Sequence, residues 1–299
     1  MQGGINMLKE RLKEYTELIN DELDKLIKIE NCPEKELLES MKYSLMAGGK
    51  RLRPALIFEG YRLLKNDYKE VSAFACAMEM VHTFSLIHDD LPAIDNDDLR
   101  RGKPTNHKVY GESTAILAGD GLLDYAYKVI ASVLQEPKNI ENKIRAFKIF
   151  ADNVFDMIKG EYVDIENEGK EISLDELMYM HDNKTAALIR ASLTIGATLA
   201  GASCDEINVL REYADIIGLT FQIRDDILGE IGDEKILGKP IGHDKINGKR
   251  TFVTVLGMEE AEKQLEEKTN EAISTLVKLA DYDTTFLKEL AIFIKERNN

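Results

Sequence analysis

The chain has 299 residues, a length that allows one large domain or two small ones. Hydrophobic residues make up 44% of it, enough for a sizeable core. Its 54 acidic and 39 basic residues give a net charge of −15, which argues against a protein that binds nucleic acid or docks on anionic lipid, because both need a basic surface. The three cysteines are odd in number and far apart, so they predict neither a disulfide framework nor a zinc site and fit a reducing cytoplasm.

The amino-terminal segment carries several acids and no apolar h-region, so Met1–Glu22 is not expected to be a secretory signal. A first helix is predicted after Pro33, where apolar residues share one face as far as Leu45 and glycine follows at Gly48. Proline at the start and glycine past the end are the usual signs of helix boundaries.

The next predicted helix, Val71–Ile87, is a 17-residue run that is apolar nearly all round. Because it is short for a membrane span and contains Glu79 and His82, it indicates a buried helix, and we expect no stable membrane insertion. A stretch rich in Ala, Leu and Ile at Lys184–Ala200 predicts a further helix, with no breaker before Gly196. The alternation typical of strands is missing, so the predicted fold is all-α.

A capping box formed by Ser173 and Glu176 predicts the start of another helix. Two stretches are predicted to be loops. Pro92–His107 is dense in charge, and Gly229–Gly248 holds five glycines in twenty residues. A loop that long inside a compact domain is usually functional.

Five aspartates fall within ten residues directly after the predicted buried helix: Asp89, Asp90, Asp95, Asp97 and Asp98. Because like charges repel, such a cluster needs a cation, and oxygen ligands suit Mg²⁺, which proteins hold with a few carboxylates plus phosphate oxygens. A solvated acidic turn is the alternative, but the preceding helix end is expected to be buried. Basic residues follow at once, so the segment predicts a phosphate held both through metal and directly.

A second acidic pair, Asp225-Asp226, also follows an apolar helical stretch, 136 residues after the first pair. Such a pair alone is usually a surface feature. Together with the first cluster, it predicts two facing helices whose carboxylates hold several Mg²⁺ ions. A diphosphate, with a charge of about −3, could bridge these ions.

The segment GGKRLRP, Gly48–Pro54, places three bases within four residues. It is not a P-loop, because the glycine spacing and the Ser or Thr after Lys are absent. An ordinary helix end is the alternative to the compact anion site that we predict here. Lys184-Thr185 and Lys239 are further, weaker candidates for contacts to an anion.

Five segments resemble, in family order, the motifs of the trans-isoprenyl diphosphate synthases: GGKRLRP, HDDLPAIDNDDLRRGKPTNH, HDNKTAALI, FQIRDD and LGKPIG. The likeness is greatest to bacterial farnesyl diphosphate synthases (geranyltranstransferases). The resemblance implies a single polyprenyl synthetase domain over residues 1–299, folded as an isoprenoid-synthase-type helical bundle around a central cavity, in a cytoplasmic homodimer. It also implies the Mg²⁺-assisted condensation of isopentenyl diphosphate with dimethylallyl or geranyl diphosphate to farnesyl diphosphate.

The same resemblance implies roles for individual residues. The expected metal ligands, for three Mg²⁺ ions that bridge the allylic diphosphate, are Asp89, Asp90, Asp95, Asp225 and Asp226. Direct contacts to isopentenyl diphosphate are expected from Lys50, Arg53, His82 and Arg101. Contacts to the allylic diphosphate are expected from Arg100, Lys184 and Lys239. Thr185 and Gln222 are expected to orient oxygens toward the carbocation, so that the catalytic group is Lys184, Thr185 and Gln222, while the released diphosphate acts as the base. Apart from the resemblance, the loop Gly229–Gly248 is expected to close as a lid, because its lysines could reach a diphosphate while its glycines bend.

Three residues depart from the family pattern. Gly229 stands where the second acidic motif usually ends in Asp, which predicts weaker Mg²⁺ binding in the third site, with Glu230 as a partial substitute. Glu161 replaces a usual Gln in the segment Gly160–Asp164, and no effect is predicted for it. Ala186 replaces a common Gly, a change expected to be minor.

The resemblance also implies that product length depends on Phe84 and Ser85, because in this family the residue five before the first Asp, here Phe84, helps to form the floor of the cavity. An aromatic residue here, combined with the insertion of Pro92 and Ala93, goes with a C15 product in the bacterial enzymes. The alternative is that Phe84 is simply a core residue.

Four other functions stay open at this stage. A geranylgeranyl diphosphate synthase would share the chemistry. A terpene cyclase would need only one diphosphate site, so the second basic site at Lys50–Arg53 argues against it. A non-catalytic regulatory subunit would typically lose the aspartates, and a Mg²⁺-dependent phosphohydrolase would release phosphate from isopentenyl diphosphate alone.

Overall fold

The computed structural model describes residues 2–65, 71–231 and 249–297. In these ranges the chain forms, in order, α1 (Gln2–Leu26), α2 (Lys35–Leu45), α3 (Leu52–Arg62), α4 (Ser72–Asp89), β1 (Leu99–Arg100), β2 (Lys103–Pro104), α5 (Asn106–Tyr110), α6 (Glu112–Leu134), α7 (Ile140–Asn167), α8 (Leu174–His181), the π-helical turn η1 (Asp182–Ala186), α9 (Ala187–Ala200), α10 (Cys204–Ile231), α13 (Phe252–Leu256), α14 (Met258–Thr275), the 3₁₀ turn η2 (Leu276–Leu279) and α15 (Thr285–Glu296).

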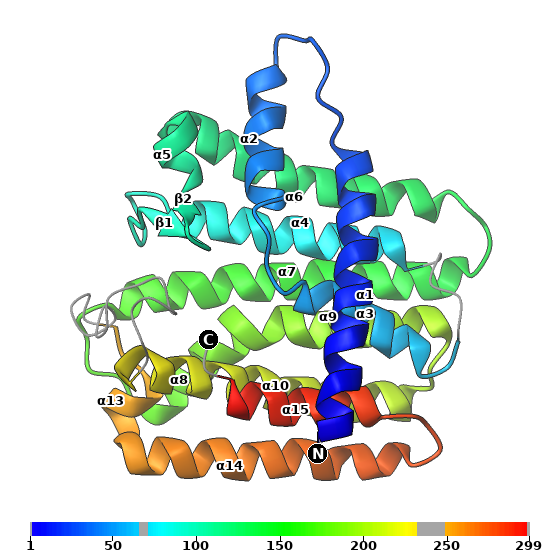
Figure 1. Ribbon diagram of the computed structural model, residues 1–299, viewed down its shortest axis with the longest axis vertical. Coiled ribbons are helices and arrows are strands. Elements are labelled where there is room, and N and C mark those ends of the chain that lie inside the picture. The colour runs from blue at the N-terminus through cyan, green and yellow to red at the C-terminus, as the bar shows by residue number, and fades with distance from the viewer. Residues whose placement is uncertain (1, 66–70, 232–248, 298–299) are drawn as a thin grey trace.

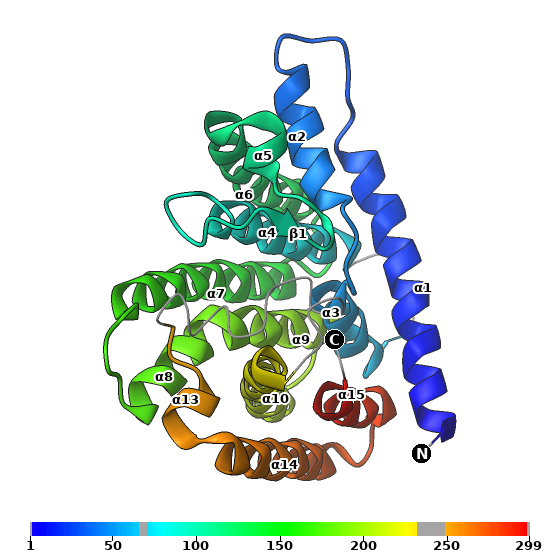
Figure 2. The ribbon, with the colours of Figure 1, turned by 60° about the vertical axis from the view of Figure 1, so that its left-hand side comes forward.

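Most of the long helices run across the molecule in a stack, and α1 crosses them (Figure 1). Within the stack, α4 packs on α6 and α3, while α9 packs on α3, α7 and α10. Seen from another side, α14 and α15 cover α10 at the edge of the bundle (Figure 2). The predicted all-α fold is confirmed.

Two helices form the centre of the core because almost every side chain on them is apolar. In α4, the buried residues include Phe74, Met78 and Val81. In α9, every residue except Arg190 is buried. A helix that is apolar all round is stable only when other helices surround it, and this position places the polar end of α4, at Asp89, inside the bundle.

Several predicted boundaries are confirmed, and others need correction. The capping box is present: Glu176 N–H donates to the Ser173 hydroxyl, and the Glu176 side chain accepts from Ser173 N–H. The helix predicted from Lys184 instead begins as the π-helical turn η1, and it runs through Gly196 without a break. Gly196, the predicted helix breaker, therefore does not end the helix. Close packing, rather than this one residue, determines where the helix forms.

The two predicted loops are shorter than expected. The first, Pro92–His107, contains the antiparallel pair β1 and β2 and the start of α5. The second was predicted from Gly229, but α10 continues to Ile231, so Gly229 and Glu230 are helical. The rest of that predicted loop and its proposed lid motion lie outside the described residues.

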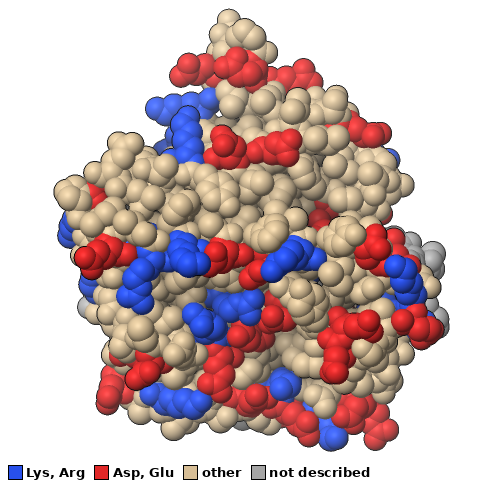
Figure 3. All heavy atoms as spheres, turned by 180° about the vertical axis from the view of Figure 1, so that it is seen from behind, with Lys and Arg blue, Asp and Glu red and all other residues tan. Residues whose placement is uncertain are grey.

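Lys and Arg side chains are interspersed with Asp and Glu on the face opposite that of Figure 1 (Figure 3). The described residues on this face therefore form no continuous basic surface of the kind that nucleic acid needs. In the described ranges, none of the helices combines the length and the apolar character that crossing a bilayer requires.

Candidate active site

A cavity of about 370 Å³ opens between α4, α7 and the η1–α9 segment. Its polar lining includes Arg53, His82, Ser85, His88, Asp89, Glu161, Tyr162, Lys184 and Thr185. Its apolar lining includes Phe84, Ile94, Met157, Ile158, Ile165 and Leu188. On α4, Asp89 lies at the carboxyl end of the helix and Phe84 more than one turn earlier. The cavity thus combines charged groups with an apolar wall that is large enough for a hydrocarbon chain.

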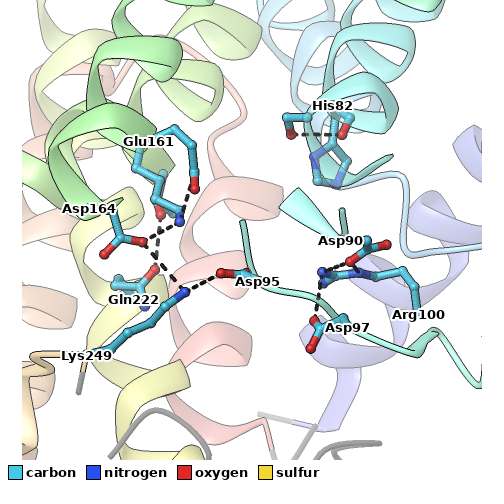
Figure 4. A network of polar contacts seen from close by, with 12 residues as sticks. His82, Asp90, Asp95, Asp97, Arg100, Glu161, Asp164, Gln222 and Lys249 are labelled. Atoms are coloured by element: carbon cyan, nitrogen blue, oxygen red, sulfur yellow. Dashed lines mark hydrogen bonds and ion pairs between the residues drawn. The ribbon is translucent and has the colours of Figure 1, made fainter. Parts of the chain in front are cut away.

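Two lysines hold the carboxylates on one side of this site together (Figure 4). Lys184 Nζ lies 2.8 Å from Glu161 Oε2 and 2.5 Å from Asp164 Oδ2. Lys249 Nζ lies 2.6 Å from Asp95 Oδ1 and 4.0 Å from Asp164 Oδ2. The network therefore joins the first acidic motif, α7, η1 and the segment before α13.

The acids of this network are buried, and burial shifts their pKa values. Burial, and after it the negative charge of Glu161, raises the pKa of Asp89 to about 8. Burial also raises the pKa of Glu161. Although burial lowers the pKa of Lys184, Asp164 and Glu161 outweigh that effect and raise it overall. Glu161 Oε1 is buried with no hydrogen-bond partner among the described residues, so one acceptor on this side is left unsatisfied.

Asp90 contacts Arg100 rather than either lysine of this network. Arg100 Nε donates to Asp90 Oδ1 at 2.9 Å, and Arg100 Nη2 lies 3.3 Å from Asp97 Oδ2. Asp90 is 3% exposed. Figure 4 shows this pair apart from the network around Lys249.

The basic residues predicted to bind a second anion meet at the start of α3. Arg53 Nη1 donates to His82 Nε2 at 3.3 Å, and Arg101 donates to the carbonyl oxygen of Gly48. Burial lowers the pKa of Arg53 to about 10, and burial followed by the charges of Arg53 and Arg101 lowers the pKa of His82 well below its ordinary range. His82 is therefore neutral at pH 7, beside the two cationic side chains.

One of the three bases in the segment Gly48–Pro54 has a structural role. Arg51 adopts a left-handed conformation, with φ 47°. Its Nη1 lies 2.6 Å from Glu79 Oε1, and both side chains are 1% exposed. This ion pair fixes the turn from which Lys50 and Arg53 project in other directions.

Lys50 and the second acidic motif meet at the carboxyl end of the chain. Arg297 Nη2 lies 2.5 Å from Asp225 Oδ1, and its guanidinium stacks on the Phe221 ring at 3.9 Å. Lys50 Nζ lies over the Phe293 ring at 5.8 Å. Burial and the charge of Arg297 lower the pKa of Lys50.

The polar residues of α10 connect η1 with α13. Thr185 Oγ1 donates to Gln222 Oε1 at 3.0 Å, and Gln222 Nε2 donates to Asp226 Oδ1 at 2.8 Å. Asp226 Oδ2 in turn accepts from Phe252 N–H, at the start of α13, at 2.7 Å. Asp226 is 4% exposed. Through its hydrogen bond to Phe252 N–H, it holds α10 and α13 together in this structure.

The structure thus brings many of the sequence-predicted residues to one cavity and leaves others beside it. Arg53, His82, Phe84, Ser85, Asp89, Lys184 and Thr185 line the same cavity. Asp90 with Arg100, Asp95 with Lys249, Asp225 with Arg297, and Gln222 with Asp226 occupy the ion pairs and hydrogen bonds above. Lys239 lies outside the described residues.

Three participants were missed by sequence reasoning. Asp164 lies three residues after Glu161 and therefore on the same face of a helix, a signal that could have found it. Lys249 and Arg297 contact acids 154 and 72 residues away in the chain, and no local pattern marks them.

The fold and the cavity define an all-α protein with a charged and partly apolar site. A polyprenyl synthetase family model matches residues 34–282. The chain is 42% identical over 290 residues to farnesyl diphosphate synthase from Geobacillus stearothermophilus, covering 96% of this chain and 97% of that protein. It is also 42% identical over 301 residues to geranylgeranyl diphosphate synthase from Cyanophora paradoxa, covering 100% and 99%.

A solved structure of a prenyl synthase is also similar to this chain. The apo structure of an FPP/GFPP synthase from Zymomonas mobilis superposes with a TM-score of 0.85 at 30% identity, covering 97% of this chain and 99% of that one. This chain belongs to the polyprenyl synthetase family, and the family predicted from the five motifs is confirmed.

Proposed function

We propose that this protein is a prenyltransferase that condenses isopentenyl diphosphate, head to tail, with dimethylallyl or geranyl diphosphate and releases farnesyl diphosphate. The observation that carries this proposal is the shared cavity, in which Asp89, Lys184 and Arg53 lie on the same walls as apolar side chains. Charged groups at one place can bind a diphosphate, while the apolar lining accommodates the hydrocarbon chain.

Mg²⁺ fits the residues present. The candidate ligands are carboxylate oxygens, which suit this cation, and Glu161 Oε1 is a buried oxygen that lacks a partner among the described residues. No group of three His, Cys, Asp or Glu side chains in the described ranges is close enough to hold a metal alone, so we expect diphosphate oxygens to complete the coordination. Asp89, Asp90 and Asp95 would bind on one side, and Asp225 and Asp226 on the other. When bound, three Mg²⁺ ions would act as Lewis acids toward the leaving diphosphate.

The chain's own residues have three tasks in this reaction. Lys184, Arg100 and Lys239 bind the allylic diphosphate, together with Lys249, whose present partner is Asp95. Arg53, Arg101, Lys50 and neutral His82 bind isopentenyl diphosphate directly. Thr185 and Gln222, already hydrogen-bonded to each other, orient oxygen dipoles toward the positive charge that develops as the allylic bond breaks.

The bond-forming steps need little else from the protein. The C4 alkene carbon of isopentenyl diphosphate attacks the allylic carbon, and a proton then leaves to the released diphosphate. The apolar side chains around this position keep water away from the carbocation.

The C15 product rests on Phe84, because sequence identity does not distinguish product lengths here. The two relatives above have different products in their names at the same 42% identity. Phe84 lines the cavity and is 7% exposed. Its ring is therefore in a position to stop a growing chain.

The deciding experiment is a product assay. The protein is incubated with Mg²⁺, labelled isopentenyl diphosphate and dimethylallyl diphosphate, and the dephosphorylated products are sized. A dominant C15 alcohol supports farnesyl diphosphate synthesis. A C20 alcohol supports the geranylgeranyl alternative, and the absence of condensation at every Mg²⁺ concentration supports a regulatory subunit. We further propose that residues 1–299 act as one cytoplasmic domain within a homodimer.

A further inference from the structure

Phe84 has an aromatic neighbour on its own helix that also lines the cavity. The His88 ring lies one turn after Phe84 on α4, with ring centroids 5.2 Å apart and planes at 83°. Aromatic rings favour this edge-to-face arrangement. The orientation of the Phe84 ring therefore depends on where His88 lies.

A second helix fixes His88. Its Nε2 lies 3.1 Å from the carbonyl oxygen of Ile116 on α6, and since a carbonyl only accepts, Nε2 is the donor. A Cβ placed on Gly119 would lie 2.2 Å from the same nitrogen and 2.5 Å from the ring carbon Cδ2. No side chain fits between α6 and the imidazole, so His88 occupies a space that exists only because residue 119 is glycine.

These contacts form a continuous path from α6 to the cavity. Gly119 leaves room for the imidazole, the Ile116 carbonyl holds it by one hydrogen bond, and the ring supports the edge of Phe84. Close packing in protein interiors leaves a side chain few alternative positions when both of its neighbours are fixed.

We propose that His88 and Gly119 are positioning residues for product length, acting through the Phe84 ring. The inference rests on the proposed prenyltransferase function. Neither residue needs to touch the diphosphates for this role. The depth of the cavity would then depend on the contact between α4 and α6 and not on Phe84 alone.

The experiment compares product lengths of four variants with that of the wild type under identical conditions. His88→Ala removes the support from Phe84, and Gly119→Ala displaces the imidazole from its position. Both are expected to raise the ratio of C20 to C15 product several-fold, in the direction expected for Phe84→Ala. His88→Phe keeps a ring beside Phe84 and is expected to retain mainly C15.

Gly121→Ala is the matched control, because it adds the same methyl group to the same helix. Its Cβ would lie 3.1 Å from Met41 Sδ, and that flexible thioether can move aside. This variant is expected to keep the wild-type product ratio.

The outcomes separate the inference from the function it rests on. If the wild type forms no condensation product, the proposed function fails. If the wild type forms C15 and both His88→Ala and Gly119→Ala give an unchanged ratio, the positioning role is overturned. Should Gly119→Ala not fold, as judged by circular dichroism, the contrast between His88→Ala and His88→Phe decides, because product length can be measured at low turnover.

Discussion

Asp89 is a carboxyl whose ionisation opposes the folded state at neutral pH. Its pKa rises from 3.8 to about 8 on folding, first through burial and then through Glu161. A raised pKa means that the contribution to stability is complete below pH 3.8 and is lost as pH rises through about 8. We therefore predict that metal-free protein loses thermal stability as pH increases across this window, and that Asp89→Asn reduces the loss. Differential scanning calorimetry with a chelator present measures both.

Glu161→Gln provides the matched variant for this prediction. It removes a charge next to Asp89 without changing side-chain size, so the pH at which stability falls is expected to move downward. Identical pH profiles for wild type, Asp89→Asn and Glu161→Gln would contradict the electrostatic coupling.

Gly229 is another residue at which the chain departs from its family. In this structure it lies on α10, within one turn of Asp225 and Asp226. A carboxylate here would add an oxygen ligand to the same helix end, so Gly229→Asp is expected to lower the Mg²⁺ concentration for half-maximal activity. The prediction is checked by titrating Mg²⁺ at saturating substrates. Gly229→Asn is the control, and equal half-saturation in all three proteins would count against a role for the missing Asp.

At the scale of elements, the turn that carries Lys184 and Thr185 depends on a close contact between helices. A π-helical turn widens the backbone and is frequent at functional sites. A Cβ on Gly218 of α10 would lie 2.3 Å from Ala186 Cβ and 2.6 Å from Ala186 Cα. The helix therefore approaches η1 as closely as a residue without a side chain permits.

We predict that Gly218→Ala destabilises the protein by about 1–3 kcal/mol through overpacking. It should also lower kcat, because Lys184 and Thr185 move with η1. Ala186→Gly in the same chain should restore part of both, since it removes one of the two overlapping atoms. Urea denaturation and kcat measurements on the two single variants and the double variant form the cycle. Strict additivity of the two changes would refute the contact.

Sequence patterns predicted the elements that depend on neighbouring residues, and missed those that depend on distant ones. The buried helix α4 and the capping box at Ser173 are local, because apolar periodicity and a residue three positions later define them. The turn η1 was not predictable, because Gly218 lies 32 residues after Ala186 and only packing brings them together.

The same distinction applies to the site in the whole molecule. The sequence indicated Asp89, Lys184 and Arg53 because each belongs to a recognisable motif, and the cavity contains all three. It did not indicate that Asp225 pairs with Arg297 or that Arg51 turns inward to Glu79. These partners follow from how α10 meets the end of the chain and how α3 meets α4.

Two helices in contact, α6 and α7, expose large apolar side chains, here called the apolar patch, which is consistent with the proposed homodimer. Leu117 on α6 is 56% exposed, and Phe155 and Tyr162 on α7 are 61% and 63% exposed. These two helices pack against each other, and Tyr162 also lines the cavity. Large exposed apolar side chains that lie together usually mark an interaction surface.

We predict that Leu117→Asp combined with Phe155→Asp halves the molar mass measured by size-exclusion chromatography with light scattering. A buried charge without a partner is costly at an apolar interface, so two identical chains could no longer associate through this patch. Activity should fall with dimer content, because Tyr162 belongs to both the patch and the cavity lining. The control is Val277→Asp on η2, where the side chain is 67% exposed and lies on a different element. A wild-type protein that is monomeric at assay concentrations, or a double variant that remains dimeric, would each rule out this patch as the dimer interface.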